Sequence, residues 1–100
     1  MSEYKPALKN FLDAEGKLKQ FPKKRRMKIL SLFYLISFFE DGKTYTEQDV
    51  NHLLALHHTF FDPATLRREL YDFHFLDRTP DGRVYRKASP LPSMESLTEE

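Results

Sequence analysis

Three side chains suited to anion binding lie close together in the sequence: Arg67, Arg68 and Tyr71. They follow Asp62-Pro63, a pair typical of the start of a helix. At about 100° per residue, all three lie away from the apolar stripe that contains Leu66. Arginine can bind guanine edges or phosphates and tyrosine can donate to phosphate, so this face is a candidate for contact with duplex DNA. The alternative is a solvated face, in which Arg68 pairs with an acid of the same helix and the stem of Arg67 covers apolar surface.

A second basic group is the run Lys23, Lys24, Arg25 and Arg26, which falls in the first turn of a helix expected to begin at Pro22. A helix N-terminus already favours anions through its free N–H groups and its dipole. We therefore interpret the run as a contact for nucleic-acid phosphates. A solubilising turn and a contact for an acidic protein surface remain the alternatives.

The dipeptide Asp81-Gly82 supplies the positive φ of a tight turn and predicts a hairpin that pairs residues 76–79 with 83–87. Side chains alternate between the two faces of a strand, so at most half of the hairpin's cations address one surface. These cations are Arg78, Arg83, Arg86 and Lys87. We assign Arg83 and Lys87 to phosphate contacts, with protection of a strand edge by charge as the alternative.

The central element of the expected core is a helix over residues 22–39, apolar on nearly every side from Ile29 onward. A short helix opened by Pro6 and a short strand over residues 17–21 are expected before it. A short extended piece is expected at residues 43–45. These elements supply the framework that positions the basic residues.

Thr46 and Asp49 form a capping-box pattern and predict the start of a further helix, whose apolar stripe includes His57. The helix that follows Asp62-Pro63 and carries Arg67 is expected to end near His74. If it continued, Phe75 would lie on the wet side, so the chain must reverse there and return Phe75 to the core.

Together these elements predict an α+β, mainly helical fold: a winged helix-turn-helix with a C-terminal β-hairpin wing. With 100 residues, of which 40% are hydrophobic, the chain fits one small domain, placed at residues 1–87. Residues 88–100 are rich in proline, serine and glutamate, which indicates a flexible acidic tail.

The net charge of +1 conceals an uneven distribution of charge. Residues 1–28 carry nine Lys and Arg against three acids, and residues 67–87 carry six against four, whereas residues 29–66 are acidic. The DNA hypothesis requires these two basic segments to fold onto a common side of the domain.

Several classes of function lack support in the sequence. Zero cysteines exclude disulfides and thiolate metal sites, and no secretory signal pattern is present, so a cytoplasmic location is expected. The longest apolar run, residues 29–39, is too short to span a membrane. His52, His57 and His58 lack the spacing of metal ligands. With neither a phosphate-binding glycine loop nor a nucleophile elbow, we expect no enzyme activity and no cofactor.

Several segments resemble a bacterial family of uncharacterised proteins, domain of unknown function 2087. They are Tyr45-Thr46-Glu47 with Val50-Asn51, Ala64 to Leu70, Leu76-Asp77-Arg78 and Asp81 to Tyr85. The resemblance implies a small winged-helix-like domain, sometimes joined to a helix-turn-helix regulator of the arsenic-repressor type. It supplies no catalytic or ligand residues. His74 departs from the pattern, since the family commonly has glycine at that position.

The leading hypothesis is therefore a DNA-binding domain that acts in transcriptional regulation. The alternative is a protein-interaction or sensory module of a regulatory system that makes no direct contact with DNA. The aromatic residues exceed the obvious needs of a small core, and a homodimer or another protein partner would give the surplus a use.

Overall fold

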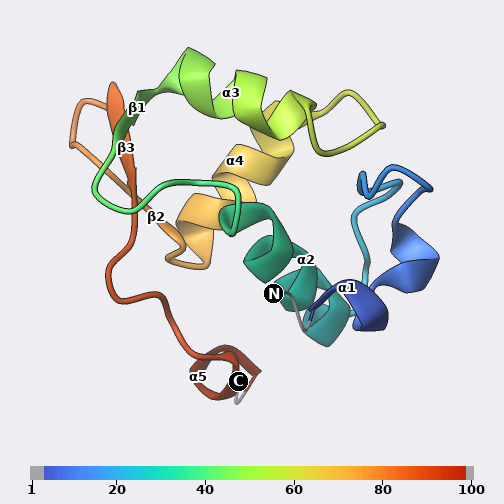
Figure 1. Cartoon of the computed structure of the whole chain (residues 1–100). Coiled ribbons are helices and arrows are strands. Elements are labelled where there is room, and N and C mark those ends of the chain that lie inside the picture. Colours follow the sequence, from blue (N-terminus) through green and yellow to red (C-terminus); the bar gives the residue numbers. More distant parts are fainter. Residues whose placement is uncertain (1–3, 99–100) are drawn as a thin grey trace.

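The computed structural model describes residues 4–98 and has a mixed α+β fold with a small antiparallel sheet (Figure 1). In chain order the elements are α1 Tyr4–Ala7, the 3-10 helix η1 Lys9–Phe11, α2 Arg25–Ile36, β1 Thr44–Thr46, α3 Glu47–Ala55, α4 Pro63–Asp72, β2 Leu76–Arg78, β3 Val84–Lys87 and α5 Met94–Thr98. The prediction of an α+β, mainly helical fold with a C-terminal hairpin is confirmed at this level. Residues 1–3 of the expected domain lie outside the described part.

Helix α2 lies in the middle of the molecule, and every residue from Ile29 to Ile36 is buried (Figure 1). Helices α1, α4 and α5 each pack against it. The expected buried helix is therefore present, although it is shorter than predicted at both ends. Lys24 has extended backbone and forms the N-cap, so Pro22 and Lys23 precede the helix. At the other end, the Phe39 N–H bonds to the Ile36 carbonyl at 3.0 Å, a tighter turn that closes the helix.

The predicted helix starts at α3 and α4 are confirmed in detail. The hydroxyl of Thr46 accepts from the Asp49 N–H at 3.0 Å, and the Asp49 carboxylate accepts from the Thr46 N–H at 3.0 Å. Asp62 accepts from the Thr65 N–H at 3.2 Å, with Pro63 as the first residue of α4. Each cap satisfies N–H groups that the first helical turn leaves without partners.

The end of α4 also follows the prediction. His74 adopts a left-handed backbone with φ 71°, and its N–H bonds to the Tyr71 carbonyl at 3.0 Å. The Phe75 N–H bonds to the Leu70 carbonyl at 2.8 Å, which completes a Schellman motif. The reversal buries Phe75, whose ring meets Phe33 edge-on at 4.8 Å between centroids. Histidine thus serves at the position where glycine was the expected residue.

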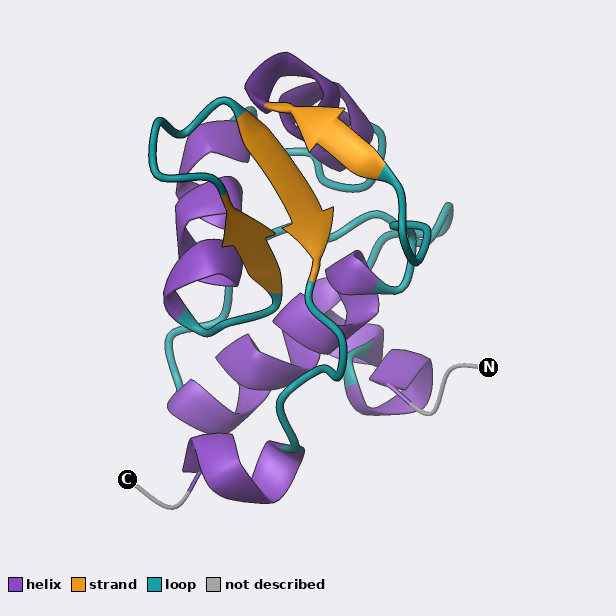
Figure 2. Cartoon of the chain, turned by 90° about the vertical axis from the view of Figure 1, so that its left-hand side faces the viewer, coloured by secondary structure: helices purple, strands orange, loops and turns teal. Residues whose placement is uncertain are grey.

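The three strands form one antiparallel sheet in the order β1-β3-β2 on one side of the helical body (Figure 2). The predicted hairpin is present, and Tyr85 lies opposite Arg78 in β2 and opposite Tyr45 in β1. The expected alternation also holds in β3, because Tyr85 is buried and Arg86 is exposed. The side chain of Lys87, on the same face as Tyr85, is only 16% exposed.

The predictions for the N-terminal segment need correction. Residues 17–21 do not form a strand, because within them only Leu18 forms β-bridges, one to Leu12 and one to His58. The Leu18 N–H bonds to the His57 carbonyl at 2.8 Å, and the Leu18 carbonyl accepts from the Thr59 N–H at 2.9 Å. Gln20 is exposed and Pro22 has no N–H, so the pairing does not extend. The helix expected to open at Pro6 begins earlier, at Tyr4.

The expected unstructured tail is replaced over residues 88–98 by a packed segment. The Ala88 N–H bonds to the Phe75 carbonyl at 2.9 Å, and α5 buries Leu97 beside α2. The composition of this segment concealed its apolar spacing, because Leu91, Met94 and Leu97 recur every three residues and all contribute to the core. The tail prediction is wrong for this part, and residues 99–100 lie outside the described residues.

A buried histidine that the sequence analysis considered only as a metal ligand joins α3 to α4. His58 is 5% exposed, and its Nε2 accepts from the Asp62 N–H at 2.9 Å. The Nδ1 atom lies 2.7 Å from the Leu54 carbonyl, so Nδ1 carries the ring proton and donates it. His57, which was assigned to the stripe of the preceding helix, instead follows the end of α3 and stacks on Phe38 with centroids 3.7 Å apart.

Within residues 4–98, no helix combines the length and the apolar character needed to cross a lipid bilayer.

We predict that His58→Phe lowers the free energy of unfolding by about 2 kcal/mol, because the partly buried N–H of Asp62 loses its acceptor. Urea titration followed by circular dichroism measures this change. His52→Phe, on the exposed side of α3, is the matched control and should change the stability by less than about 0.5 kcal/mol. Equal effects of the two substitutions would contradict the role assigned to His58.

A second prediction concerns the pH dependence of stability. Burial lowers the pKa of His57 below its ordinary value of 6.5, and the Lys17 charge lowers it further. The unfolded chain therefore takes up this proton more readily, so the contribution of neutral His57 is complete above pH 6.5 and is lost as the pH falls through the lower folded-state value.

The test measures unfolding by urea about one pH unit above and about one pH unit below the ordinary histidine pKa of 6.5. Stability should fall toward the lower pH, and His57→Gln should reduce the fall. His52→Gln removes an exposed histidine and serves as the control. An identical pH dependence in His57→Gln and the parent protein would refute the assignment.

Candidate nucleic-acid interface

A hollow of about 260 Å³ lies between α4 and the β2–β3 hairpin. Three arginines, two tyrosines and one aspartate line it: Arg67, Arg68, Tyr71, Asp72, Arg78 and Tyr85. The hollow therefore combines three permanent positive charges with two phenol hydroxyls and a single carboxylate. This set of donors suits an anion with several oxygens, such as a phosphate diester.

Arg67 does not project outward as the sequence predicted. One terminal nitrogen of its guanidinium donates to the Asn51 side-chain oxygen at 2.6 Å, and the other lies 3.4 Å from the Glu47 carboxylate. Its side chain is only 14% exposed. The helical projection placed Arg67 relative to Leu66 but could not include α3, which packs beside α4 and covers this arginine. Arg67 thus fixes α4 against α3, and Glu47 offsets much of its charge.

Arg68 and Tyr71 fulfil the sequence prediction more closely. Arg68 is exposed, and Tyr71 is half-buried beside it on the hollow. Arg68 also lies near enough to the α4 N-cap to help lower the pKa of Asp62, although the hydrogen bonds from Thr65 are the main cause of that shift. Arg68 is therefore accessible to a ligand above the α4 surface, whereas Tyr71 is partly covered.

Arg78 is a site residue that the sequence analysis counted among the hairpin cations without assigning it a role. Its guanidinium lies over the Tyr71 ring, 4.2 Å from the centroid. A side-chain hydrogen bond with Tyr85 raises the pKa of Arg78 above its ordinary value, and Tyr71 adds to this effect. The two tyrosines therefore hold the charge of Arg78 at the hollow. Arg78 lies opposite Tyr85 in the hairpin, so the two side chains share one face of the sheet.

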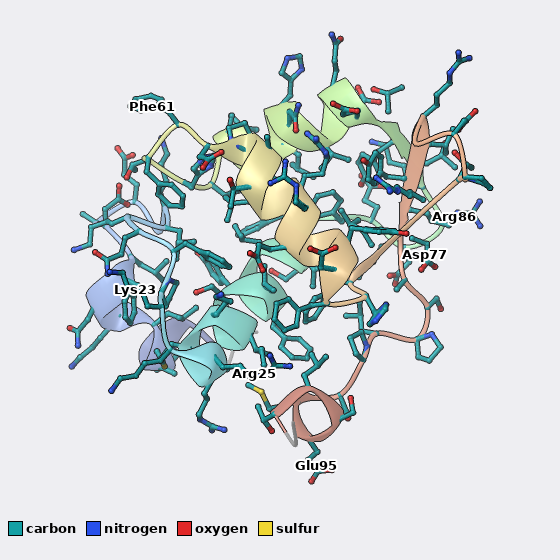
Figure 3. All side chains as sticks on the ribbon, turned by 180° about the vertical axis from the view of Figure 1, so that it is seen from behind. Lys23, Arg25, Phe61, Asp77, Arg86 and Glu95 are labelled. Atoms are coloured by element: carbon teal, nitrogen blue, oxygen red, sulfur yellow. The ribbon has the colours of Figure 1, made fainter. Side chains whose placement is uncertain are left out.

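The other hairpin cations occupy different environments. The side chain of Arg83 is 84% exposed next to the turn, with Asp81 4.0 Å away. Lys87 faces away from solvent, and its ammonium lies 3.2 Å from the Asp41 carboxylate and 3.5 Å from the Phe39 carbonyl. Lys87 is thus engaged in joining the sheet to the loop after α2, which corrects its assignment to a phosphate. Arg86 lies opposite Asp77 on the outer face of the hairpin (Figure 3).

The run of Lys23 to Arg26 forms a separate group. Figure 3 places Lys23 and Arg86 at opposite ends of the molecule, with α4 between them. Arg25 donates from Nε to the Leu97 carbonyl at 3.0 Å, and its guanidinium lies 5.1 Å from the centre of the Phe73 ring. Lys23 and Lys24 are exposed beside a groove at the start of α2. The structure thus gathers Arg67, Arg68 and Tyr71 around Arg78 but leaves the Lys23–Arg26 run outside that group.

A search against protein families matches residues 17–87 to a family described as "Uncharacterized protein conserved in bacteria" (DUF2087). The match includes α2, the whole sheet and every residue that lines the hollow, whereas α1 and α5 lie outside it. Neither the curated proteins nor the solved structures contain a match to this chain. Because the family match covers well over half of the sequence, the chain belongs to this uncharacterised bacterial family.

Proposed function

We propose that this chain is a winged helix-turn-helix domain that binds duplex DNA in bacterial transcriptional regulation. In the proposal α3 and α4 form the helix-turn-helix, α4 enters the major groove and the β2–β3 hairpin is the wing. The sheet order β1-β3-β2, with β1 leading directly into α3, supports this assignment. The absence of cysteine is compatible with a cytoplasmic location for such a domain.

The observation that carries the proposal is the convergence of Arg68, Arg78 and Tyr71 between α4 and the hairpin. A phosphate seated there accepts charge-assisted hydrogen bonds from two guanidinium groups that come from different elements. Arg78 is already held in place by two tyrosine side chains, so little conformational entropy is lost when it binds. Arg67 acts as a positioning residue that orients α4.

Other residues of this surface set the strength of the interaction. Arg83 extends from the hairpin turn and is free to reach a neighbouring phosphate. Asp72 at the hollow and Asp77 on the hairpin repel phosphate and oppose these contacts. The proposal therefore implies moderate affinity with a strong dependence on salt. It gives Lys23–Arg26 no part in the DNA contact, because Lys23 lies at the other end of the molecule from the hairpin (Figure 3) and Arg25 is bonded to the Leu97 carbonyl.

The second candidate function is a protein-interaction or sensory module, and exposed apolar side chains favour it. Phe61 is 94% exposed and has a left-handed backbone with φ 55°, a conformation that is costly for a bulky residue. Leu56 is also largely exposed in the segment between α3 and α4. A second copy of the chain or another protein that covers these two residues would account for their exposure.

For the DNA proposal, we predict that log affinity for a mixed-sequence duplex falls linearly with log salt concentration. Replacing Arg68 and Arg78 together with glutamine should reduce the magnitude of the slope by about 0.9, since the two arginines share one phosphate and each lost phosphate contact contributes about 0.9. Fluorescence anisotropy with a labelled duplex measures this slope.

Lys23→Gln with Lys24→Gln is the matched control, because it removes the same charge at the other end of the molecule. This pair should leave the slope unchanged. Equal effects of the two pairs would show that net charge alone governs binding, and no detectable binding at low salt would exclude DNA as the ligand.

A further prediction separates the two neighbouring arginines of α4. Arg67→Met should lower the free energy of unfolding by about 1.5 kcal/mol, because its hydrogen bond to Asn51 and its ion pair with Glu47 are largely shielded from water. Arg68→Met should weaken DNA binding while changing stability by less than about 0.5 kcal/mol. Urea denaturation and anisotropy on both variants test this separation, and the reverse pattern would contradict the assigned roles.

A further inference from the structure

A second binding surface lies at the other end of the molecule from the hairpin. A groove of about 500 Å³ runs beside the start of α2, between apolar side chains and lysines. We infer that this groove docks an acidic amphipathic segment of a partner protein. The inference does not depend on DNA binding, because none of the residues that line this groove lines the hollow between α4 and the hairpin.

The floor of the groove is apolar. Phe11, Phe21 and Met27 line it, and all three are half-buried and packed against the main core. The segment before α2 is non-helical as far as Lys24, which leaves these side chains partly open next to one another. The core thus supports the floor from below, and the flexible thioether of Met27 lets it adapt to the shape of a ligand.

The rim of the groove is strongly basic. Residues 17–28 contain seven Lys and Arg and no acid. Of these cations, Lys23 and Lys24 line the groove itself and are exposed. The Lys28 ammonium lies 5.5 Å from the centre of the Phe21 ring, so a further positive charge is held directly at the apolar floor. An occupant must therefore supply acidic groups around an apolar centre.

The combination favours a peptide over a nucleic acid. Phosphates need the lysines but gain nothing from the Phe11 and Met27 side chains. Single-stranded bases need open aromatic faces for stacking, whereas Lys28 already lies over the Phe21 ring. An amphipathic helix with apolar residues at positions i, i+3 and i+4 and acids beside them satisfies both the floor and the rim.

The contacts of Arg25 are consistent with a groove whose positive charge comes from lysines. Its bond to the Leu97 carbonyl and its position over the Phe73 ring direct it toward α4 and α5. The basic run is therefore shared between a structural arginine and the lysines of the groove. This arrangement gives the densest cationic stretch of the chain a use that the DNA proposal leaves open.

The experiment uses the full chain and a labelled synthetic peptide of about 15 residues, long enough to form a helix. The peptide carries leucine or phenylalanine on one helical face and glutamate elsewhere. Fluorescence anisotropy should show saturable binding. A second peptide with the same glutamates, but with serine in place of the apolar residues, should bind at least about tenfold more weakly, because burial of one apolar side chain supplies about that factor.

Substitutions in the protein test the same surface from the other side. Lys23→Glu with Lys24→Glu should weaken binding of the apolar peptide at least about tenfold, and both residues are exposed, so the fold is not at risk. Met27→Glu should have a similar effect by placing a charge in the floor. Arg83→Glu with Arg86→Glu makes the same charge change at the hairpin and should leave peptide binding unchanged.

Four results would overturn the inference. They are no binding of the apolar peptide, equal binding of the serine peptide, equal weakening by the hairpin pair, and tighter binding of a single-stranded oligothymidine that the Lys23 and Lys24 substitutions abolish. The last result would assign the groove to nucleic acid. Absence of duplex binding by the unsubstituted protein would overturn only the proposed function, so the two failures are distinguishable.

Discussion

The burial of α2 on every side is the constraint on which the rest of the structure depends. Eight consecutive residues, Ile29 to Ile36, are excluded from water, and no single element can cover all sides of a helix. α1, α4 and α5 therefore each pack against a different part of it. The position of α4 determines where the hairpin begins, because the Schellman turn at its end leads Phe75 into the core and Leu76 into β2. The two candidate surfaces thus both result from how one buried helix is covered.

Polar contacts then set the orientation of α4 more precisely than apolar packing does. The His58 ring accepts from the Asp62 N–H at the first turn, and one turn further along Arg67 binds Asn51 and Glu47 of α3. Hydrogen bonds have narrow geometric limits, whereas apolar contacts tolerate sliding. These contacts hold the face that carries Arg68 and Tyr71 toward the hairpin, where Arg78 completes the hollow. The geometry of the hollow therefore depends on the contacts that α4 makes with α3 and with the segment that joins the two helices.

The sequence predicted the features whose causes are local. The Thr46 capping box, the Asp62 cap and the reversal at His74 depend on residues within one helical turn, and all three are present. It failed where the cause is a distant element. The orientation of Arg67 depends on α3, and the packing of Leu97 depends on α2, so neither can be derived from the periodicity of its own segment. The cluster of side chains at the hollow shows the same limit. Arg78 lies over the Tyr71 ring only because the sheet register and the turn at the end of α4 together bring the two residues close.

The two basic segments of the chain lie at two separate surfaces of the folded molecule. Lys23 and Lys24 precede α2, and Figure 3 places Lys23 at the other end of the molecule from the hairpin, with α4 between them. Two exposed basic surfaces at that distance are only weakly coupled at physiological ionic strength, where the screening length is about 8 Å. In the two proposals each surface therefore selects its ligand by its own chemistry. Arginines held by tyrosines favour the oxygens of a phosphate, and lysines around an apolar floor favour carboxylates attached to apolar residues. The two proposed ligands, a duplex and a protein partner, do not compete in these proposals, since the hollow and the groove share no lining residue.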